Sequence, residues 1–395
     1  MPPSDRSAGY GKRLFVAVAF GAMAAQTGRV VISPLLPTII DELAITPFAA
    51  GLALSLMWAL SAAFQYFGGR FSDLLSHKTV LAAAVGCIVL GFATLGVTTF
   101  YPLFVLGTAV IGVGIGLYNT AAYAQMADLF TERRGTAFGG LSASMDLGAA
   151  LASGVATVVL AVAVWQTAFL PLLLVMVVVL AAMHVLNDES YVLERPSLNV
   201  RETAGRIFGT PSVRLSLVCL GGFAFVWQGL ASFLPTYLQL ERGIAPAPAN
   251  AAFTGLFVVG IVARPLLGDL GDRMGHLTVA TIVPLLTAAG LVLVLVGPSF
   301  PVIVGGILLL GGGLSAFFVL VQTDVMNRFP VASMGGDFGA TRTVFVGIGS
   351  LGPAYIGFAA ERVGYTGAFV GLLVVIGGTF LLLLQIRRQS GSTAE

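Results

Sequence analysis

GDLGDRMGH, residues 268–276, is a short polar segment between two long apolar stretches of the chain. A related segment, GRFSDLLSHK, covers residues 69–78 and has the same place in the first half. The two segments begin 268 − 69 = 199 residues apart, and other short matches recur at nearly the same spacing: Leu36-Pro37-Thr38 with Leu234-Pro235-Thr236, and Phe138-Gly139 with Phe338-Gly339. This repeat indicates that the second half of the chain is a duplicate of the first.

The composition is that of a membrane protein. Hydrophobic residues make up 57% of the chain, charged residues only 10%, and the mean hydropathy is +0.95, whereas soluble domains have about 25% charged residues. In hydrocarbon every spanning segment must satisfy its own backbone hydrogen bonds, and the apolar runs are continuous, which favours helices. Runs of about 20 apolar residues predict an all-α fold of twelve transmembrane helices, near residues 14–40, 47–70, 78–98, 100–127, 135–163, 165–186, 213–239, 248–270, 276–297, 299–326, 336–360 and 364–386. Five prolines inside these spans are expected to kink their helices: Pro34, Pro37, Pro171, Pro235 and Pro265.

The longest polar segment divides these helices into two sets of six. We therefore expect an N-terminal bundle over residues 1–186, a linker over 187–212 and a C-terminal bundle over 213–395. Six helices per half preserve orientation, so the halves are predicted to be parallel repeats about a pseudo-twofold axis along the membrane normal, with substrate between them.

Positive charges predict the orientation of the helices. Fifteen of the twenty Lys and Arg residues fall on the side of the two termini and only Arg242 and Arg362 on the other, while Arg29, Arg264 and Arg342 lie inside helices. Cytoplasmic loops hold the positive charge, so both termini are expected in the cytoplasm, with the protein in the plasma or inner membrane.

Several other classes of function are disfavoured. A net charge of +2 without a basic arm gives no reason to expect nucleic acid as a partner. Cys87 and Cys219 lie in apolar runs, and the three histidines are scattered, so we expect no disulfide, metal or cofactor. A receptor or an intramembrane enzyme would need extra domains or a nucleophile and base pair. The expected partners are the bilayer, a small-molecule substrate and protons, and the expected functional form is a monomer.

The two loops resemble a motif of the major facilitator superfamily, Gly-x-x-x-Asp-Arg-x-Gly followed by a basic residue. The first copy departs from it, because Leu74 replaces the usual Arg and Ser76 the usual Gly. The resemblance covers the whole chain and implies the twelve-helix fold of that superfamily. It also suggests a gate in which each Asp faces the positive N-terminus of a helix in the other half; the alternative is a tight turn whose charges only set topology. The gating residues are expected to be Gly69, Asp73, Gly268, Asp272, Arg273, Arg133 and Arg134.

Arg264 is the first candidate for substrate binding. It lies eight residues before Asp272, which places it roughly 12 Å from the loop along a helix, and no acidic residue lies within one turn. Its repeat counterpart is the neutral Gln65. An arginine at this place resembles the carboxylate-binding arginine of oxalate/formate antiporters and monocarboxylate transporters. A charge inside a span is costly and usually faces a cavity or a partner.

Other polar residues inside spans are further candidates. Arg29 lies midway along the first expected helix, while Arg342 lies near a helix end, where snorkelling or pairing is an equal alternative. Asp146 is expected to compensate these charges or to carry a proton, because burial raises a carboxyl pKa and a nearby Arg lowers it. The remaining candidates for substrate binding could hydrogen-bond a solute or simply pack: Gln65, Tyr118, Asn119, Tyr123, Trp227, Gln228 and Gln322. Asp324, near a helix end, is expected like Asp146 to carry a proton or compensate charge, with a helix cap or a gate partner as the alternative.

Two transport functions remain open on the sequence. Proton-coupled drug exporters of the superfamily have an Arg four residues before Gly-x-Gly and a Gly-Pro motif in the fifth helix. Here Thr108 is the residue four positions before Gly112-Val113-Gly114, where those exporters have Arg. The fifth helix reads Asp146-Leu147-Gly148-Ala149-Ala150, which contains no proline. We therefore predict uptake or exchange of a small organic anion by alternating access, as symport or antiport, with export of drugs or other hydrophobic compounds as the alternative.

Overall fold

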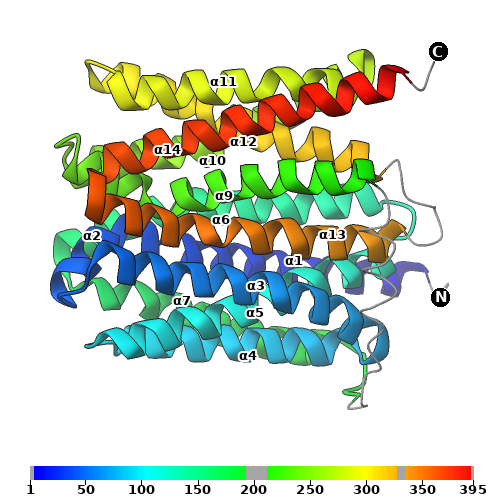
Figure 1. The fold of residues 1–395 in the computed structure, drawn as a ribbon. Helices are drawn as coiled ribbons and strands as arrows, with labels where there is room; N and C mark the ends of the chain where they lie inside the picture. The colour runs from blue at the N-terminus through cyan, green and yellow to red at the C-terminus, as the bar shows by residue number, and fades with distance from the viewer. Residues whose placement is uncertain (1–3, 193–210, 327–333, 393–395) are drawn as a thin grey trace. The chain divides into compact units, whose positions relative to one another are not determined.

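A computed structural model describes residues 4–192, 211–326 and 334–392. These residues form helices joined by short loops (Figure 1), and no strand occurs among them. The elements are α1 (Ser4–Val30), α2 (Ile32–Glu42), α3 (Pro47–Leu74), α4 (His77–Gly96), α5 (Tyr101–Leu129), α6 (Arg134–Val162), the 3₁₀ turn η1 (Trp165–Ala168), α7 (Phe169–Leu186), α9 (Pro211–Leu240), α10 (Pro246–Met274), α11 (His276–Val296), α12 (Phe300–Met326), α13 (Met334–Gly349) and α14 (Leu351–Ser392).

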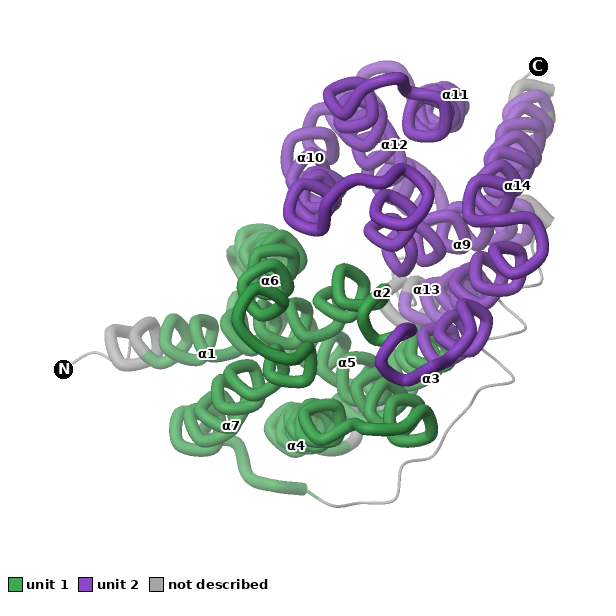
Figure 2. Tube along the Cα trace, turned by 90° about the vertical axis from the view of Figure 1, so that its left-hand side faces the viewer, with its two compact units in different colours: residues 1–39, 56–198 green, residues 40–55, 199–395 purple. Residues whose placement is uncertain are grey.

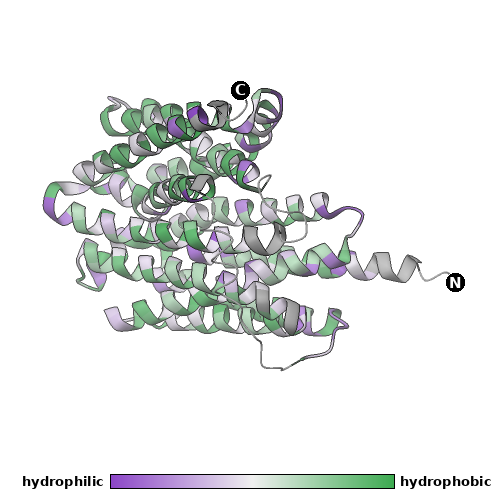
Figure 3. Ribbon diagram, turned by 45° about the vertical axis from the view of Figure 1, so that its right-hand side comes forward, coloured by the Kyte–Doolittle hydropathy of each residue, from purple (hydrophilic) through white to green (hydrophobic). Residues whose placement is uncertain are grey.

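The apolar helices are long enough to cross a bilayer. Eleven such spans are present in the described part of the chain, and hydrophobic residues predominate along them (Figure 3). The last span, Gly339–Arg388, contains Gly364 at φ 74°, a left-handed conformation that a helix cannot continue through. Glu241 accepts the backbone N–H of Tyr365 at 2.9 Å just after this turn. The turn separates the two crossings predicted there, so the all-helical membrane fold is confirmed.

Prolines account for two interruptions, one of which was expected from Pro34 and the other, from Pro353, was not. Helix geometry lapses at Val31, three residues before Pro34, and at Ser350, three residues before Pro353. A proline has no N–H to donate to the residue four positions earlier. The helices predicted over 14–40 and 336–360 are therefore each divided, into α1 and α2 and into α13 and the start of α14. Pro171 makes no kink, because it lies in the first turn of α7, where a missing N–H costs nothing.

The chain forms two compact units, which Figure 2 colours separately. Unit 1 holds residues 1–39 and 56–198. In it α1 packs on α6 and α7, and α4 packs on α5. Glycines bring α5 against α3: a methyl group on Gly116 would lie 2.5 Å from the carbonyl oxygen of Ser61, and one on Gly112 would collide with the carbonyl of Met57. This is the close approach that small residues at i and i+4 allow in membrane helices.

Unit 2 holds residues 40–55 and 199–395. In it α10 and α11 pack on α12, and α9 packs on α13 and α14. The first turns of α3 belong to this unit, where Ser55 accepts the N–H of Ala354 and Glu361 accepts the N–H of Phe48, both at 2.8 Å. The bundle boundaries predicted at 187–212 stay a prediction.

Candidate functional site

Arg29 is a charged residue inside a span of unit 1 that contacts Gln26 and Trp58. It lies in the last turn of α1, and its Nη2 donates a hydrogen bond to Gln26 Oε1 at 2.6 Å. Its guanidinium carbon lies 4.2 Å from the ring centroid of Trp58 in α3. Cation–π stacking occupies the face of a guanidinium, whereas carboxylates bind to the in-plane N–H groups at its edge. The half-buried side chain is thus oriented in a way that is compatible with anion binding.

Asp146 lies on the helix that packs beside α1. The two helices meet at Thr27, whose hydroxyl donates to the carbonyl of Gly148 at 2.9 Å. A methyl group on Gly148 would collide with the carbonyl of Met23, so the backbones are in direct contact here. Asp146 lies two residues before Gly148 and is half-buried. The structure therefore places a carboxylate on the helix adjacent to the one that carries Arg29.

The polar residues of α5 have two different environments. The hydroxyls of Tyr123 and Ser142 of α6 are 2.7 Å apart, and the half-buried Asn119 lies one turn before Tyr123. Tyr118, in contrast, is 1% exposed, and its hydroxyl donates to the carbonyl of Val18 at 2.6 Å. Packing, the alternative weighed for Tyr118, is what this geometry favours.

Arg264 is the corresponding charge of unit 2. A methyl group on Gly260 would lie 2.6 Å from the hydroxyl oxygen of Ser315 in α12 and 3.7 Å from Nε of Arg264. Nε of Arg264 therefore lies near Gly260, where α10 contacts α12. Phe257 lies two turns before Arg264, on the same face of the helix, and its ring centroid is 5.6 Å from that of Trp227 in α9. The side chain of Arg264 is half-buried.

The repeat extends to a pair of positions that the sequence analysis did not connect. Arg264 and Asp324 correspond to Gln65 and Gln125, since 264 − 65 and 324 − 125 are both 199. Gln125 is 1% exposed, and neither polar atom of its side chain has a hydrogen-bond partner among the described residues. Gln65 is also buried, at 6% exposed. Repeat spacing alone would have identified this charged pair of positions in one unit and its neutral counterpart in the other.

The remaining candidates of unit 2 lie on α9, α12 and α13. Gln228 is buried, and its amide donates to the carbonyl of Val346 at 3.1 Å. Arg342 lies one turn before Val346 and is half-buried, as are Gln322 and Asp324 on α12. Gln228 therefore joins α9 to α13, while the contact of these residues with a substrate stays a prediction.

The end of α10 leads into a tight turn and carries an exposed ion pair and a contact between Asp272 and His276. Asp272 lies 3.0 Å from His276, and Arg273 lies 2.8 Å from Asp269. Gly275 has φ 89°, a left-handed conformation that explains why this position holds glycine. Gly268 is less constrained, because a methyl group there would meet only Val319, at 3.8 Å.

The loop after α3 makes the corresponding turn without a glycine at the position of Gly275. Ser76, which replaces the glycine, is extended at φ −95° and its hydroxyl accepts the N–H of Thr79, so it caps α4. Gly69 has open space beside it, and the side chain of Asp73 lies outside the described residues. On α6, Arg133 is the N-cap residue and Arg134 donates to the carbonyl of Ala127 at 3.0 Å. The gating role of both loops stays a prediction.

The segment after α7 is bound to the same end of unit 1, which the sequence did not suggest. Glu189 lies 3.4 Å from His77 and accepts the N–H of Lys78 at 3.1 Å. The hydrogen bond from His77 holds the pKa of Glu189 below its ordinary value of 4.5, against a smaller opposing effect of burial. Lys78 also donates to the carbonyl of Asn187 at 2.7 Å and lies over the ring of Tyr191.

Within the described part of the chain, no three His, Cys, Asp or Glu residues are placed to hold a metal ion. The chemistry available in the spans is therefore that of guanidinium, amide, carboxylate and aromatic groups. These groups can bind and orient a polar or charged solute.

Comparisons with known proteins agree with this chemistry. Residues 18–353 match the family model of the Major Facilitator Superfamily. A probable sulfoacetate transporter of Cupriavidus necator is 29% identical over 380 residues, covering 86% of this chain and 85% of that protein. An uncharacterized transporter of the major facilitator type, YhhS of Shigella flexneri, is 25% identical over 363 residues, covering 87% of this chain and 81% of that protein.

Two kinds of solved structure share the fold. A bacterial homologue of the human lysosomal transporter Spinster, in an inward-facing and occupied conformation, has a TM-score of 0.82 at 14% identity, with 96% of this chain and 97% of that chain covered. The nucleoside transporter NupG has a TM-score of 0.78 at 14% identity, with 96% and 99% covered.

Proposed function

The chain belongs to the major facilitator superfamily of membrane transporters, and on that premise we propose that it carries small organic anions across the cell membrane. The anions are carboxylates and sulfonates, moved by alternating access as symport or exchange. Both termini are assigned to the cytoplasm, in keeping with the distribution of Lys and Arg.

One observation carries the proposal: each unit holds a half-buried arginine within a span, Arg29 in unit 1 and Arg264 in unit 2. Charges inside a membrane are expensive and mark substrate or ion pathways. A guanidinium presents a rigid fork of N–H donors that matches carboxylate and similar oxyanions. Two such groups favour anions as substrates and disfavour lipophilic cations.

The relative from Cupriavidus necator supports the same class of substrate. Its name gives sulfoacetate, an anion with one carboxylate and one sulfonate group. Both groups present oxygen acceptors to N–H donors, so one set of arginines can serve either. Other two-carbon to four-carbon acids with two anionic groups belong to the same chemical class.

Two carboxylates, Asp146 and Asp324, are the candidates for proton coupling and for charge compensation. Asp146 lies on the helix that packs against α1, and Asp324 lies on the helix that packs against α10. A carboxylate near an arginine can balance its charge when no anion is bound, or can take up a proton. We assign Asp146 to coupling and Asp324 to charge compensation.

A thermal-shift binding screen tests the proposal. The purified full chain in detergent is heated with sulfoacetate, monocarboxylates, dicarboxylates, sulfate, phosphate or the lipophilic cation tetraphenylphosphonium. A ligand stabilises the state that it binds, by about 2.7 kcal/mol at a hundred times its Kd. We expect stabilisation by organic anions that increases with the number of anionic groups. Stabilisation by the lipophilic cation alone would replace this proposal with drug export.

A further inference from the structure

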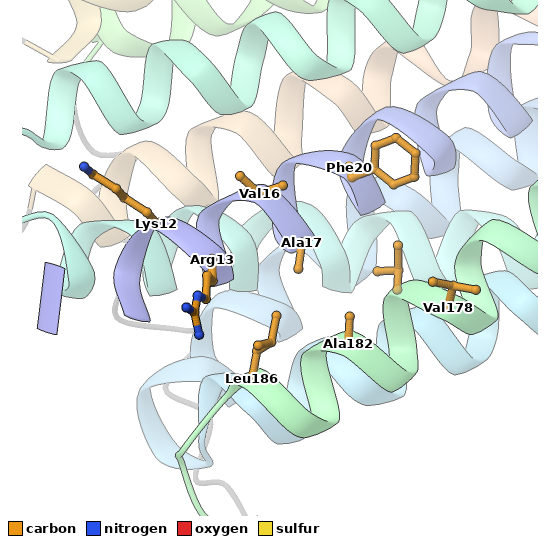
Figure 4. A pocket seen from close by; sticks show the side chains of 9 residues that line it. Lys12, Arg13, Val16, Ala17, Phe20, Val178, Ala182 and Leu186 are labelled. Carbon is orange, nitrogen blue, oxygen red and sulfur yellow. The ribbon is translucent and has the colours of Figure 1, made fainter. Parts of the chain in front are cut away.

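A groove on unit 1 has the features of a lipid-binding site. It lies between α1 and α7, has a volume of about 470 Å³, and has walls that are apolar except at one end (Figure 4). Its residues are Val16, Ala17, Phe20, Val178, Val179, Ala182 and Leu186, with Lys12 and Arg13 at the end.

The groove follows the length of an apolar chain. Lys12 to Phe20 on α1 and Val178 to Leu186 on α7 each span eight residues, or roughly 12 Å. Ala17 and Val179 are buried and form the floor, whereas Val16 and Phe20 are 64% and 48% exposed and form the rim. Small side chains on the floor between larger ones on the rim leave room for an inserted hydrocarbon chain.

Two basic residues lie at one end of the groove. Arg13 points toward Leu186 of α7, whereas Lys12, on the same turn of α1, extends in a different direction, away from α7 (Figure 4). Both side chains are exposed, and within the described residues neither makes a hydrogen bond or an ion pair. Among the described residues, no acidic side chain therefore neutralises their charges.

Two acidic residues, Asp188 and Glu189, begin the segment after α7 at this end. Tyr10 donates to Asn187 at 3.4 Å and accepts the N–H of Asp188 at 3.3 Å, which joins the start of α1 to the end of α7. The carboxylate of Glu189 is engaged by His77 and Lys78. Asp188 is exposed, and within the described residues no hydrogen bond or ion pair engages its carboxylate.

We propose that this groove binds an anionic phospholipid, with one acyl chain between α1 and α7 and the phosphate at Arg13 and Lys12. Basic residues at the end of spanning helices attract anionic headgroups, and an apolar groove that ends at such a pair fits both parts of a phospholipid. A zwitterionic lipid could fill the groove but would gain less from the two charges. The bound lipid is therefore expected to stabilise the contact between α1 and α7.

The test compares lipids on variants of the full chain. Purified protein is titrated with phosphatidylglycerol or phosphatidylcholine, and binding is followed by native mass spectrometry and by melting temperature. Lys12→Gln with Arg13→Gln should weaken phosphatidylglycerol binding by about fivefold for each charge removed. The matched control is Arg387→Gln with Arg388→Gln, an exposed basic pair at the end of α14 that should leave binding unchanged.

A second variant tests the apolar part. Ala182→Trp fills the groove without changing charge and should reduce binding of both lipids. Ala182→Met fills the groove less and should reduce binding less. It provides the test if Ala182→Trp does not fold. If the two basic double variants lose phosphatidylglycerol binding equally, general surface charge explains the binding and the proposal is overturned. Stabilisation by glycerol phosphate equal to that by phosphatidylglycerol would show a phosphate site without lipid, which also contradicts it.

Discussion

Replacing Arg264 should weaken anion binding even where the positive charge is kept. In Arg264→Lys the ammonium can supply one strong hydrogen bond, whereas the guanidinium supplies two in a fixed plane. Nε of Arg264 lies near Gly260, a placement that a shorter, unbranched ammonium does not reproduce. Affinity for a carboxylate should therefore fall in Arg264→Lys and fall further in Arg264→Gln.

The size of the loss follows from the hydrogen bonds removed. Each charge-assisted hydrogen bond contributes about 1.5 to 3 kcal/mol, and Arg264 is half-buried, so the lower figure applies. One lost bond then reduces affinity by at least about tenfold, which corresponds to 1.4 kcal/mol. Expression should persist, because removal of a charge from a span relieves a cost of desolvation.

The assay is anion binding by isothermal titration, with apparent affinity for uptake in proteoliposomes as a second readout. Arg29→Gln is the comparison variant, since it removes the half-buried arginine from the span in unit 1. If Arg29→Gln abolishes uptake while both Arg264 variants keep the affinity of the wild type, the anion anchor lies in α1 and the assignment of Arg264 is wrong.

Three further predictions concern coupling, packing and pH. Asp146→Asn should abolish accumulation driven by a proton gradient yet retain exchange of substrate in proteoliposomes; retained uphill transport would leave Asp146 only a charge-compensating role. Gly112→Ala should lower the free energy of unfolding by about 1 to 3 kcal/mol, because the methyl group meets the backbone of α3; the control Gly86→Ala, which has open space, should be neutral or stabilising in the same denaturation assay. The pKa of Glu189 is lowered by its hydrogen bond with His77, so its contribution to stability is present above pH 4.5 and is lost as the pH falls further; Glu189→Gln should flatten that part of the melting profile, and an unchanged acid limb would assign the titration to another group.

The sequence was sufficient for the fold because the signals of membrane proteins are local and strong. Apolar runs, the polar loop at 268–276 and the repeat spacing of 199 each follow from the solvent in which the chain folds. Gly112 and Gly116 have the spacing of small residues that lets membrane helices approach closely, and the structure places them against α3. An interruption was expected from Pro34 and lies three residues earlier, at Val31, whereas the one at Ser350, three residues before Pro353, was not expected.

The candidate site was less accessible to sequence reasoning. The charged residues were found because charge is rare in a span, but their partners depend on tertiary contacts. Nothing local indicates that Trp58 of α3 lies over Arg29 of α1, or that Glu189 reaches His77. The correspondence between Gln125 and Asp324 was visible in the repeat. In other duplicated transporters, corresponding positions of this kind can be found by comparing every polar residue with the residue at the repeat spacing.

Exchange of a labelled organic anion in proteoliposomes tests the central claim most directly. Vesicles that contain the full chain are loaded with unlabelled sulfoacetate or succinate and diluted into the labelled acid. We expect uptake of the labelled acid above that of empty vesicles and competition by other carboxylates and sulfonates. The rate of exchange should be reduced for both Arg29→Gln and Arg264→Gln. Absence of exchange for every organic anion, together with movement of tetraphenylphosphonium through the same vesicles, would contradict the central claim.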